Sequence, residues 1–199
     1  MTSIPVNAQV SDQSKQEQLG VQYYQNEEYE KALPIFEDLF EDDRSSSYIY
    51  EYYLNTLLKL KNYDDAERML KKQTRKFDDK LQYKIDLGYV YKLKKDEKQA
   101  KKTYKSVLED LPSNRDQIQI VANSFKNRGA LEYAIKTYKN GRKYLDSEFA
   151  FSLELARLYR KNDQYEPMFS EYLKTIQDDP QSKGLVKGEL QEMVMENKP

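Results

Sequence analysis

A step of 34 residues recurs along the chain and constrains its fold more than any other feature. Four positions within the step keep small, aromatic or other apolar residues through five copies. The first position holds Gly20, Leu54, Gly88, Ala122 and Ala156, and the second holds Tyr23, Leu57, Tyr91, Phe125 and Tyr159. The third holds Ala32, Ala66, Ala100, Ala134 and Met168, and the fourth holds Phe36, Leu70, Tyr104, Tyr138 and Tyr172. A fixed period of this length predicts an array in which each unit packs on its neighbours.

Each unit is predicted to fold as two amphipathic helices of about 14 residues, each about 21 Å long. In the first unit Leu19, Gly20 and Tyr23 fall on one helical face. The small residues at Gly20 and Ala32 let the two helices approach closely, and Tyr23 and Phe36 fill the space toward the next unit. One pair of helices cannot bury both of its apolar faces, so stacking of units is required.

Polar turn residues separate the predicted helices of each pair, at Asn26, Asn62, Asp96, 127–129 and 162–163. Pro112 and Pro180 follow helix ends and close two of the units. Two further prolines, Pro34 and Pro167, fall inside second helices. Each is expected to remove one backbone hydrogen bond and to bend its helix without breaking it.

The pattern resembles the tetratricopeptide repeat, whose 34-residue unit reads Leu-Gly-x2-Tyr, then Ala, then x3-Phe, then Pro. The third unit is the most similar to it, with Leu87, Gly88, Tyr91, Ala100, Tyr104 and Pro112. Arg44 stands where the first unit should have Pro, and Met168 replaces the small residue in the fifth. The resemblance covers about residues 13–182. It implies an all-α, right-handed solenoid of five helix-turn-helix units followed by a C-terminal capping helix.

The period places the units at 13–46, 47–80, 81–114, 115–148 and 149–182. Residues 183–199 are predicted to form a lone capping helix and a tail, with Val186, Leu190 and Met193 as its apolar stripe. Residues 1–12 are expected to be a flexible N-terminal segment. Within them Val6–Ala8 resembles the small-residue cleavage site of a bacterial signal peptide, which would make the protein exported or periplasmic. The alternative is a polar N-terminus of a cytoplasmic protein.

Composition excludes several classes of function. The chain has no His and no Cys, which removes His-based catalysis, thiolate nucleophiles and zinc-finger sites. We therefore expect no enzyme activity, no metal and no cofactor. The 33 basic and 34 acidic residues nearly cancel, which argues against a nucleic-acid partner. No apolar run approaches the roughly 20 residues of a membrane-spanning helix.

The resemblance implies that ligands bind on an inner, concave face built from the first helices. Candidate residues on that face are aromatic or amide-bearing early in the chain and basic later. They are Tyr48, Tyr52, Asn55, Tyr89, Lys92, Asn123, Lys126, Arg157, Arg160 and Lys161. This composition favours a protein or peptide ligand with an acidic side chain or a C-terminal carboxylate at the basic end.

Two alternatives remain open. The candidate residues can be ordinary solvated helix surface, with Glu51, Asp86, Asp116 and Glu154 neutralising the basic residues in weak surface pairs. The array can also be structural, serving weak homo-oligomerisation or docking into a larger assembly. Its natural contact would then be the C-terminal edge near Leu185, Val186 and Met193.

Overall fold

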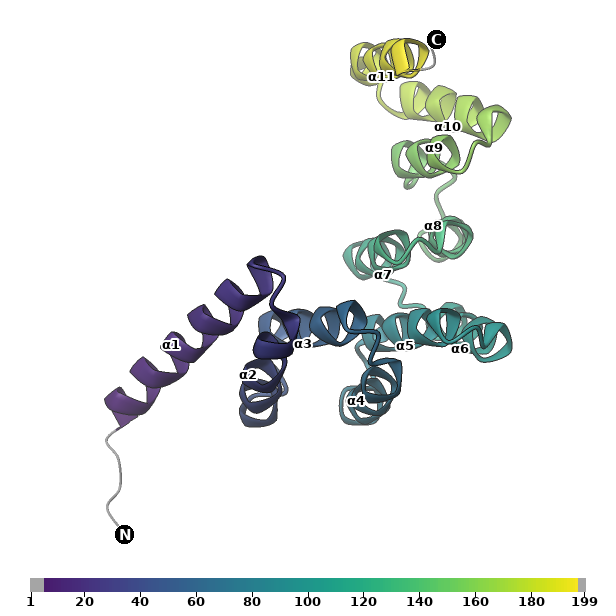
Figure 1. The fold of residues 1–199 in the computed structure, drawn as a ribbon. Helices are drawn as coiled ribbons and strands as arrows, with labels where there is room; N and C mark the ends of the chain where they lie inside the picture. The colour runs from purple at the N-terminus through teal and green to yellow at the C-terminus, as the bar shows by residue number, and fades with distance from the viewer. Residues whose placement is uncertain (1–5, 197–199) are drawn as a thin grey trace. The chain divides into compact units, whose positions relative to one another are not determined.

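In the computed structural model, the described residues are 6–196 for the backbone and 13–195 for the side chains. Within these residues every regular element is a helix, and the expected all-α fold is confirmed (Figure 1). The elements are α1 (Val6–Gln25), α2 (Tyr29–Asp42), α3 (Ser47–Lys59), α4 (Tyr63–Lys76), α5 (Leu81–Leu93), α6 (Glu97–Glu109), α7 (Arg115–Asn127), α8 (Leu131–Tyr144), α9 (Ser152–Lys161), α10 (Tyr165–Asp178), the 3-10 turn η1 (Pro180–Ser182) and α11 (Lys183–Glu196).

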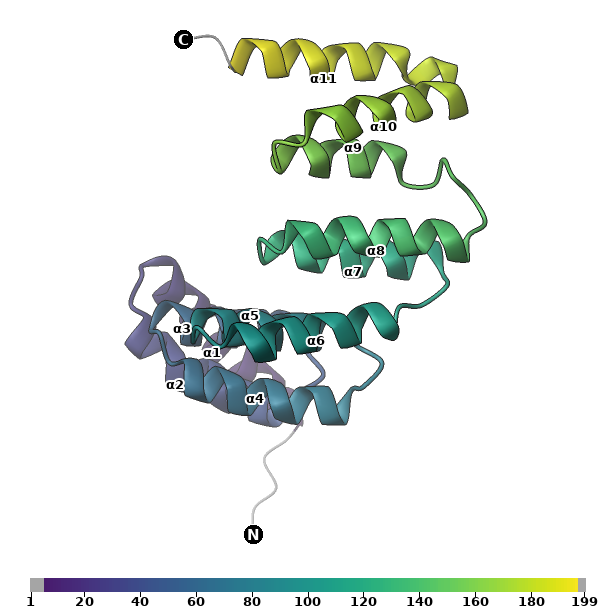
Figure 2. The same ribbon diagram turned by 90° about the vertical axis from the view of Figure 1, so that its right-hand side faces the viewer.

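The chain divides into two compact units, residues 1–100 and 101–199, with the boundary inside α6. In the first unit α1 packs on α2, α2 on α3, α3 on α4, and α4 on α5. In the second, α7 pairs with α8, and α9 pairs with α10. Figure 2 shows these two pairs as successive layers, with α11 lying beyond α10.

The helix boundaries follow the 34-residue step. Second helices begin at Tyr29, Tyr63, Glu97, Leu131 and Tyr165, each 34 residues after the last. The first helices α3, α5 and α7 begin at Ser47, Leu81 and Arg115, and α11 begins at Lys183 in the same register. After α3, only α9 departs from this series, because it begins at Ser152, three residues later than the step gives.

The four repeated positions form the core, as the sequence predicts. At the third and fourth positions all ten side chains are buried, including Tyr104 at 4% exposure. Tyr23 and Tyr91 at the second position are half-buried, and the other three are buried. Gly20 shows why the first position favours small residues, since an added Cβ would lie 3.1 Å from side-chain atoms of Ile35 and of Phe36 on α2. Close approach of α1 and α2 therefore depends on Gly20.

Both internal prolines lie in continuous helices, as expected. Pro34 is the sixth residue of α2, where it cannot donate to the carbonyl of Glu30. For Pro167 the expected loss of a hydrogen bond is wrong. It is the third residue of α10, and the Met168 N–H makes the first bond of that helix, to the Gln164 carbonyl at 3.2 Å. Pro167 comes just before Met168, where a backbone nitrogen has no carbonyl partner within the helix, so the proline removes no hydrogen bond.

The N-terminal segment differs in extent from the expectation. Residues 1–5 lie outside the described residues, and α1 already begins at Val6. The cleavage-site residues Val6–Ala8 belong to the part of α1 whose side chains are not described, so the leader stays a prediction. None of the described helices is long and apolar enough to cross a membrane.

The turn inside each helix pair repeats one backbone geometry. The middle of its three residues has a positive φ, at Glu27, Lys61, Lys95, Gly129 and Asp163, again 34 residues apart. The turn is closed by the residue that follows: the Asn62 N–H donates to the Leu57 carbonyl at 2.8 Å, and the Asp96 N–H donates to the Tyr91 carbonyl at 2.9 Å. Only one of the five is glycine, so four side chains are held in the left-handed region at a cost of about 1–2 kcal/mol each.

Replacing Lys61 or Lys95 by glycine should therefore stabilise the protein. The strain relief exceeds the added freedom of glycine in the unfolded chain, so we expect the free energy of unfolding to rise by about 0.5–1 kcal/mol per site. Urea denaturation followed by circular dichroism measures this change. Lys61→Ala is the matched control, because it removes the same charge and keeps the strain. Equal stability of the glycine and alanine variants would contradict the argument.

A buried ion pair joins α8, α9 and α10 in the second unit. Arg142 of α8 donates through Nη1 and Nη2 to the two carboxylate oxygens of Glu171 on α10, at 2.9 and 2.5 Å. Its Nε donates to the Ala150 carbonyl at 2.7 Å, and Nη2 also reaches Ser152 Oγ at 2.8 Å. The side chains of Arg142 and Glu171 are only 12% and 10% exposed.

The late start of α9 belongs to the same region. Phe151 precedes the helix with φ of 61° and is 1% exposed, with the Arg115 guanidinium 4.6 Å from its ring centre. Gly141 makes room for it, because an added Cβ would lie 3.1 Å from the Phe151 ring and 2.8 Å from Ile118 Cγ2. The joint between α8 and α9 is thus built differently from the earlier ones.

Candidate functional site

Three of the predicted residues meet in a groove of the first unit. We call it the tyrosine groove, and it has a volume of about 560 Å³. Its lining residues are Tyr24, Ser47, Tyr48, Glu51, Tyr52, Asn55 and Gln82. Tyr48, Tyr52 and Asn55 come from α3, and Ser46 fixes the start of that helix by accepting a hydrogen bond from the Ile49 N–H at 3.3 Å. Gln82, on α5, was not among the residues that the sequence placed on this face.

The tyrosines of this groove hold one another in place. The Tyr52 ring stacks on Phe36 with centres 5.0 Å apart and meets Tyr24 edge-to-face at 5.1 Å. Tyr48 lies edge-to-face with Tyr52 at 5.0 Å and remains 47% exposed. Burial raises the pKa of the Tyr24 and Tyr48 hydroxyls, so both are protonated at neutral pH. The groove therefore offers pre-positioned aromatic faces with hydroxyl and amide groups at its edge.

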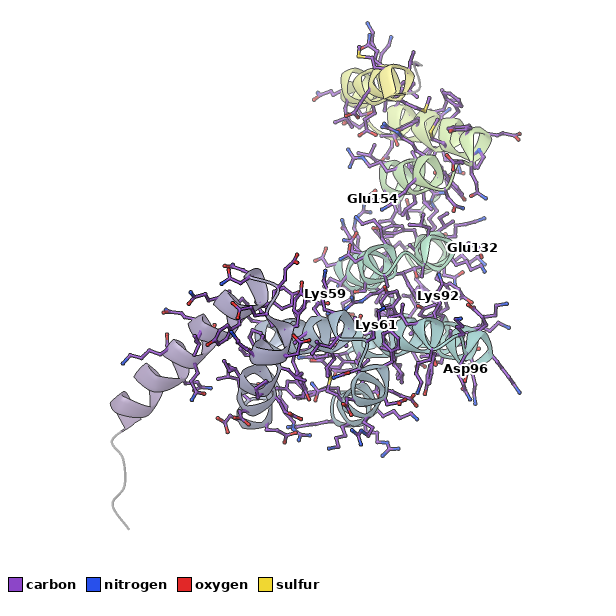
Figure 3. All side chains as sticks on the ribbon, in the orientation of Figure 1. Lys59, Lys61, Lys92, Asp96, Glu132 and Glu154 are labelled. Carbon is purple, nitrogen blue, oxygen red and sulfur yellow. The ribbon has the colours of Figure 1, made fainter. Side chains whose placement is uncertain are left out.

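Two other predicted residues of the first unit do not line this groove. Tyr89 and Lys92 both lie on α5, where Tyr89 is half-buried and Lys92, labelled in Figure 3, is exposed. The sequence interpretation was also wrong about Asp86, which lies on the same helix. It was expected to neutralise surface cations, but it is 3% exposed and accepts a hydrogen bond from the Tyr50 hydroxyl at 2.5 Å.

The second unit brings four predicted residues together between α7 and α9. This basic groove has a volume of about 360 Å³. It is lined by Gln119, Ala122, Asn123, Lys126, Tyr138, Glu154, Arg157, Leu158 and Lys161. Asn114 caps α7, accepting from the backbone N–H groups of Asp116 and Gln117 at 2.9 and 3.2 Å. The amides of Gln119 and Asn123 therefore stand beside the cations of Lys126 and Lys161 on two neighbouring helices.

The charges of the basic groove are only partly balanced. Glu154, labelled in Figure 3, is the one carboxylate among its lining residues. Lys126 and Lys161 are exposed, and neither makes an ion pair with the side chains of residues 13–195. The groove can therefore hold an anionic group, while the amides can bond to the backbone of an extended peptide.

Arg157 and Arg160 are engaged by α11. Nε and Nη2 of Arg157 donate to Glu189 Oε1 at 2.9 and 2.5 Å. Arg160 Nη1 lies 3.4 Å from Glu192 Oε2 and 3.5 Å from the Glu189 carbonyl oxygen. With Lys161, these residues border a second hollow of about 560 Å³ between α9 and α11. The expected partners of the basic residues were Glu51, Asp86, Asp116 and Glu154, so the carboxylates of α11 were missed.

Glu189 is held as a carboxylate. Burial alone would raise its pKa, but hydrogen bonds from Arg157 and the Tyr172 hydroxyl, together with the charge of Arg160, outweigh burial and lower the pKa. The Tyr172 hydroxyl donates to Glu189 Oε2 at 2.7 Å. Burial, followed by this hydrogen bond, raises the pKa of Tyr172 to about 12. Among the described side chains, no group of three or more acidic residues is placed to hold a metal ion.

Comparison with known proteins gives family matches over the first part of the chain. Two tetratricopeptide repeat models match it, one at residues 23–85 and one at residues 86–114. A search of curated proteins finds no match.

Solved structures of similar chains include a thermophilic TPR protein of Thermus thermophilus. It is 19% identical with a TM-score of 0.46, over 92% of this chain and 99% of that chain. They also include a double mutant of MamA RS-1, at 13% identity and a TM-score of 0.44, over 86% of this chain and 97% of that chain.

Proposed function

Because the chain belongs to the tetratricopeptide repeat family, we propose that it is a non-catalytic scaffold that binds a peptide or protein segment along its first helices. Such repeats usually serve protein–protein interaction, which makes a protein partner the expected one. The basic groove between α7 and α9 supports a finer proposal. It binds an acidic side chain or a C-terminal carboxylate of that partner.

The observation that carries this proposal is the pair of unbalanced lysines beside two amides. Lys126 and Lys161 have no ion-pair partner among the described side chains, although Arg157 and Arg160 nearby do. A ligand carboxylate supplies the missing anion, and Asn123 and Gln119 donate to and accept from its backbone. The tyrosine groove of the first unit adds aromatic faces suited to apolar side chains of a ligand.

Reversing the charges of both lysines should weaken this binding strongly. Peptides are first selected on the wild-type protein from a random library with free carboxyl termini. We expect the selected peptides to be acidic, and Lys126→Glu with Lys161→Glu should weaken their binding at least about tenfold by replacing attraction with repulsion. Fluorescence anisotropy at low and physiological salt measures the dissociation constants.

Lys139→Glu with Lys143→Glu on α8 is the matched control, since both lysines are exposed and neither lines the basic groove. It carries the same change in net charge and should alter binding less than about twofold. Selected peptides without acidic bias, or equal losses in the two double variants, would contradict the proposed groove.

A second candidate function is self-association or docking into a larger assembly. The contact surface that the sequence suggested for this role, the C-terminal edge around Val186, needs correction. Val186 is only 2% exposed and packs within its own chain. An apolar stripe on α10 favours the idea instead. Tyr165, Phe169 and Leu173 follow one another at intervals of four residues and are 43%, 45% and 62% exposed. A concentration-dependent mass in light scattering would support this candidate.

A further inference from the structure

Two arginines on α9 face two glutamates on α11 with matched spacing. Arg157 and Arg160 are three residues apart, one helical turn, and so are Glu189 and Glu192. Arg157 is paired with Glu189 at 2.5 Å, and Arg160 with Glu192 at 3.4 Å. The guanidinium groups that the sequence assigned to an acidic ligand are therefore already occupied by an acidic helix of the same chain.

Apolar packing holds α11 only weakly. Val186 is its one buried side chain among those described, with Leu190 and Met193 half-buried. Leu185, Val194 and Met195 remain exposed. Gly184 and Gly188 lower the helix propensity, and no atom beyond the local backbone of α11 lies within 4 Å of a Cβ built at either. The position of α11 thus depends heavily on the polar contacts of Glu189 and Glu192.

We propose that α11 is a built-in ligand: Glu189 and Glu192 occupy Arg157 and Arg160 in place of a partner's acidic helix. A partner segment with two carboxylates one turn apart competes with α11 for this surface. The proposal rests on the proposed scaffold function and names the class of segment that the basic end accepts. It also makes binding there dependent on release of α11.

The probe is a fluorescein-labelled peptide of residues 183–196 with Gly184 and Gly188 replaced by alanine. The alanines raise its helicity without adding a contact, because the space around both glycines is open. Its affinity is measured by anisotropy on the full chain and on Glu189→Gln with Glu192→Gln. We expect the double variant to bind the labelled peptide about tenfold more tightly than the wild type does. This is the gain when a competitor, here α11, that occupies the site about nine-tenths of the time is removed.

Three further variants sharpen the measurement. Glu148→Gln with Glu166→Gln removes two exposed carboxylates that do not contact Arg157 or Arg160, and should leave the affinity unchanged. Adding Arg157→Gln and Arg160→Gln to the α11 double variant should abolish binding. Glu192→Gln alone keeps Glu189 and its hydrogen bond to Tyr172, and should raise the affinity by about two- to threefold.

Unchanged affinity in the Glu189→Gln, Glu192→Gln variant overturns the proposal, and so does an increase that survives loss of both arginines. Hydrogen exchange of the α11 amides checks the same variant, and faster exchange without tighter peptide binding also overturns it. These outcomes are separate from the scaffold proposal. Selected acidic peptides that still depend on Lys126 and Lys161 would leave that function standing.

Discussion

Replacing Arg142 by alanine is expected to lower the free energy of unfolding of the second unit by about 3–5 kcal/mol. The reason is that the change leaves Glu171 as a buried carboxylate without its forked partner. It also removes the donors to the Ala150 carbonyl and to Ser152 Oγ. Lys174, whose Nζ lies 3.7 Å from Glu171, replaces the lost pair only in part. Urea denaturation followed by circular dichroism gives the change.

The double variant Arg142→Met with Glu171→Leu separates the loss of one partner from the value of the pair. With both charges gone, no ion is buried alone, and we expect the double variant to be more stable than Arg142→Ala by more than about 1.4 kcal/mol. The unpaired Ala150 carbonyl keeps it below the wild type, by about 1–3 kcal/mol. A double variant as unstable as Arg142→Ala would mean that packing, not charge, dominates this joint.

Replacing Phe125 by alanine is expected to cost about 3–5 kcal/mol of folding free energy. Phe125 is fully buried, with its ring 5.2 Å from Tyr104 in an edge-to-face contact and 5.5 Å from Tyr133 in a stacked one. The truncation removes buried apolar surface and leaves a cavity between rings that cannot collapse without breaking both contacts. Thermal and urea unfolding both report the loss.

Phe169→Ala is the matched control for this prediction. The side chain is the same, but it is 45% exposed on α10. Its truncation should therefore cost under about 1 kcal/mol. Similar losses for Phe125 and Phe169 would show that α10 is covered in solution, which would favour self-association through its apolar stripe.

The periodicity of the sequence is sufficient to predict the helix pairs and most of their core. The third and fourth repeated positions are buried in every copy, from Ala32 and Phe36 to Met168 and Tyr172. Met168 fits where alanine is usual, with no exposure, since an unbranched side chain can thread a narrow space. The pattern of small and large residues therefore carries the fold.

The remaining features depend on backbone geometry and on distant partners, which residue types do not reveal. The residue type does not predict the positive φ of Lys61 or Lys95, because the helices on either side impose the geometry of the turn. Phe151 in the same conformation delays α9, and this could not be foreseen from an aromatic residue. Glu189 falls 34 residues after the buried Leu155, where an apolar residue was to be expected. It is tolerated because Arg157 and Tyr172 satisfy its carboxylate.

Repeat arrays are often regarded as interchangeable modules that evolution lengthens by duplication. Arg142 sets a limit to that freedom in this chain. One step of 34 residues earlier, the positions of Arg142 and Glu171 are held by Leu108 and Thr137. If a copy of the last helix pair replaced the pair before it, its equivalent of Glu171 would lie opposite Leu108 instead of an arginine. A negative charge would then be buried without a partner. The side chains at this contact therefore fix the order of the final units, and recombination there should be disfavoured.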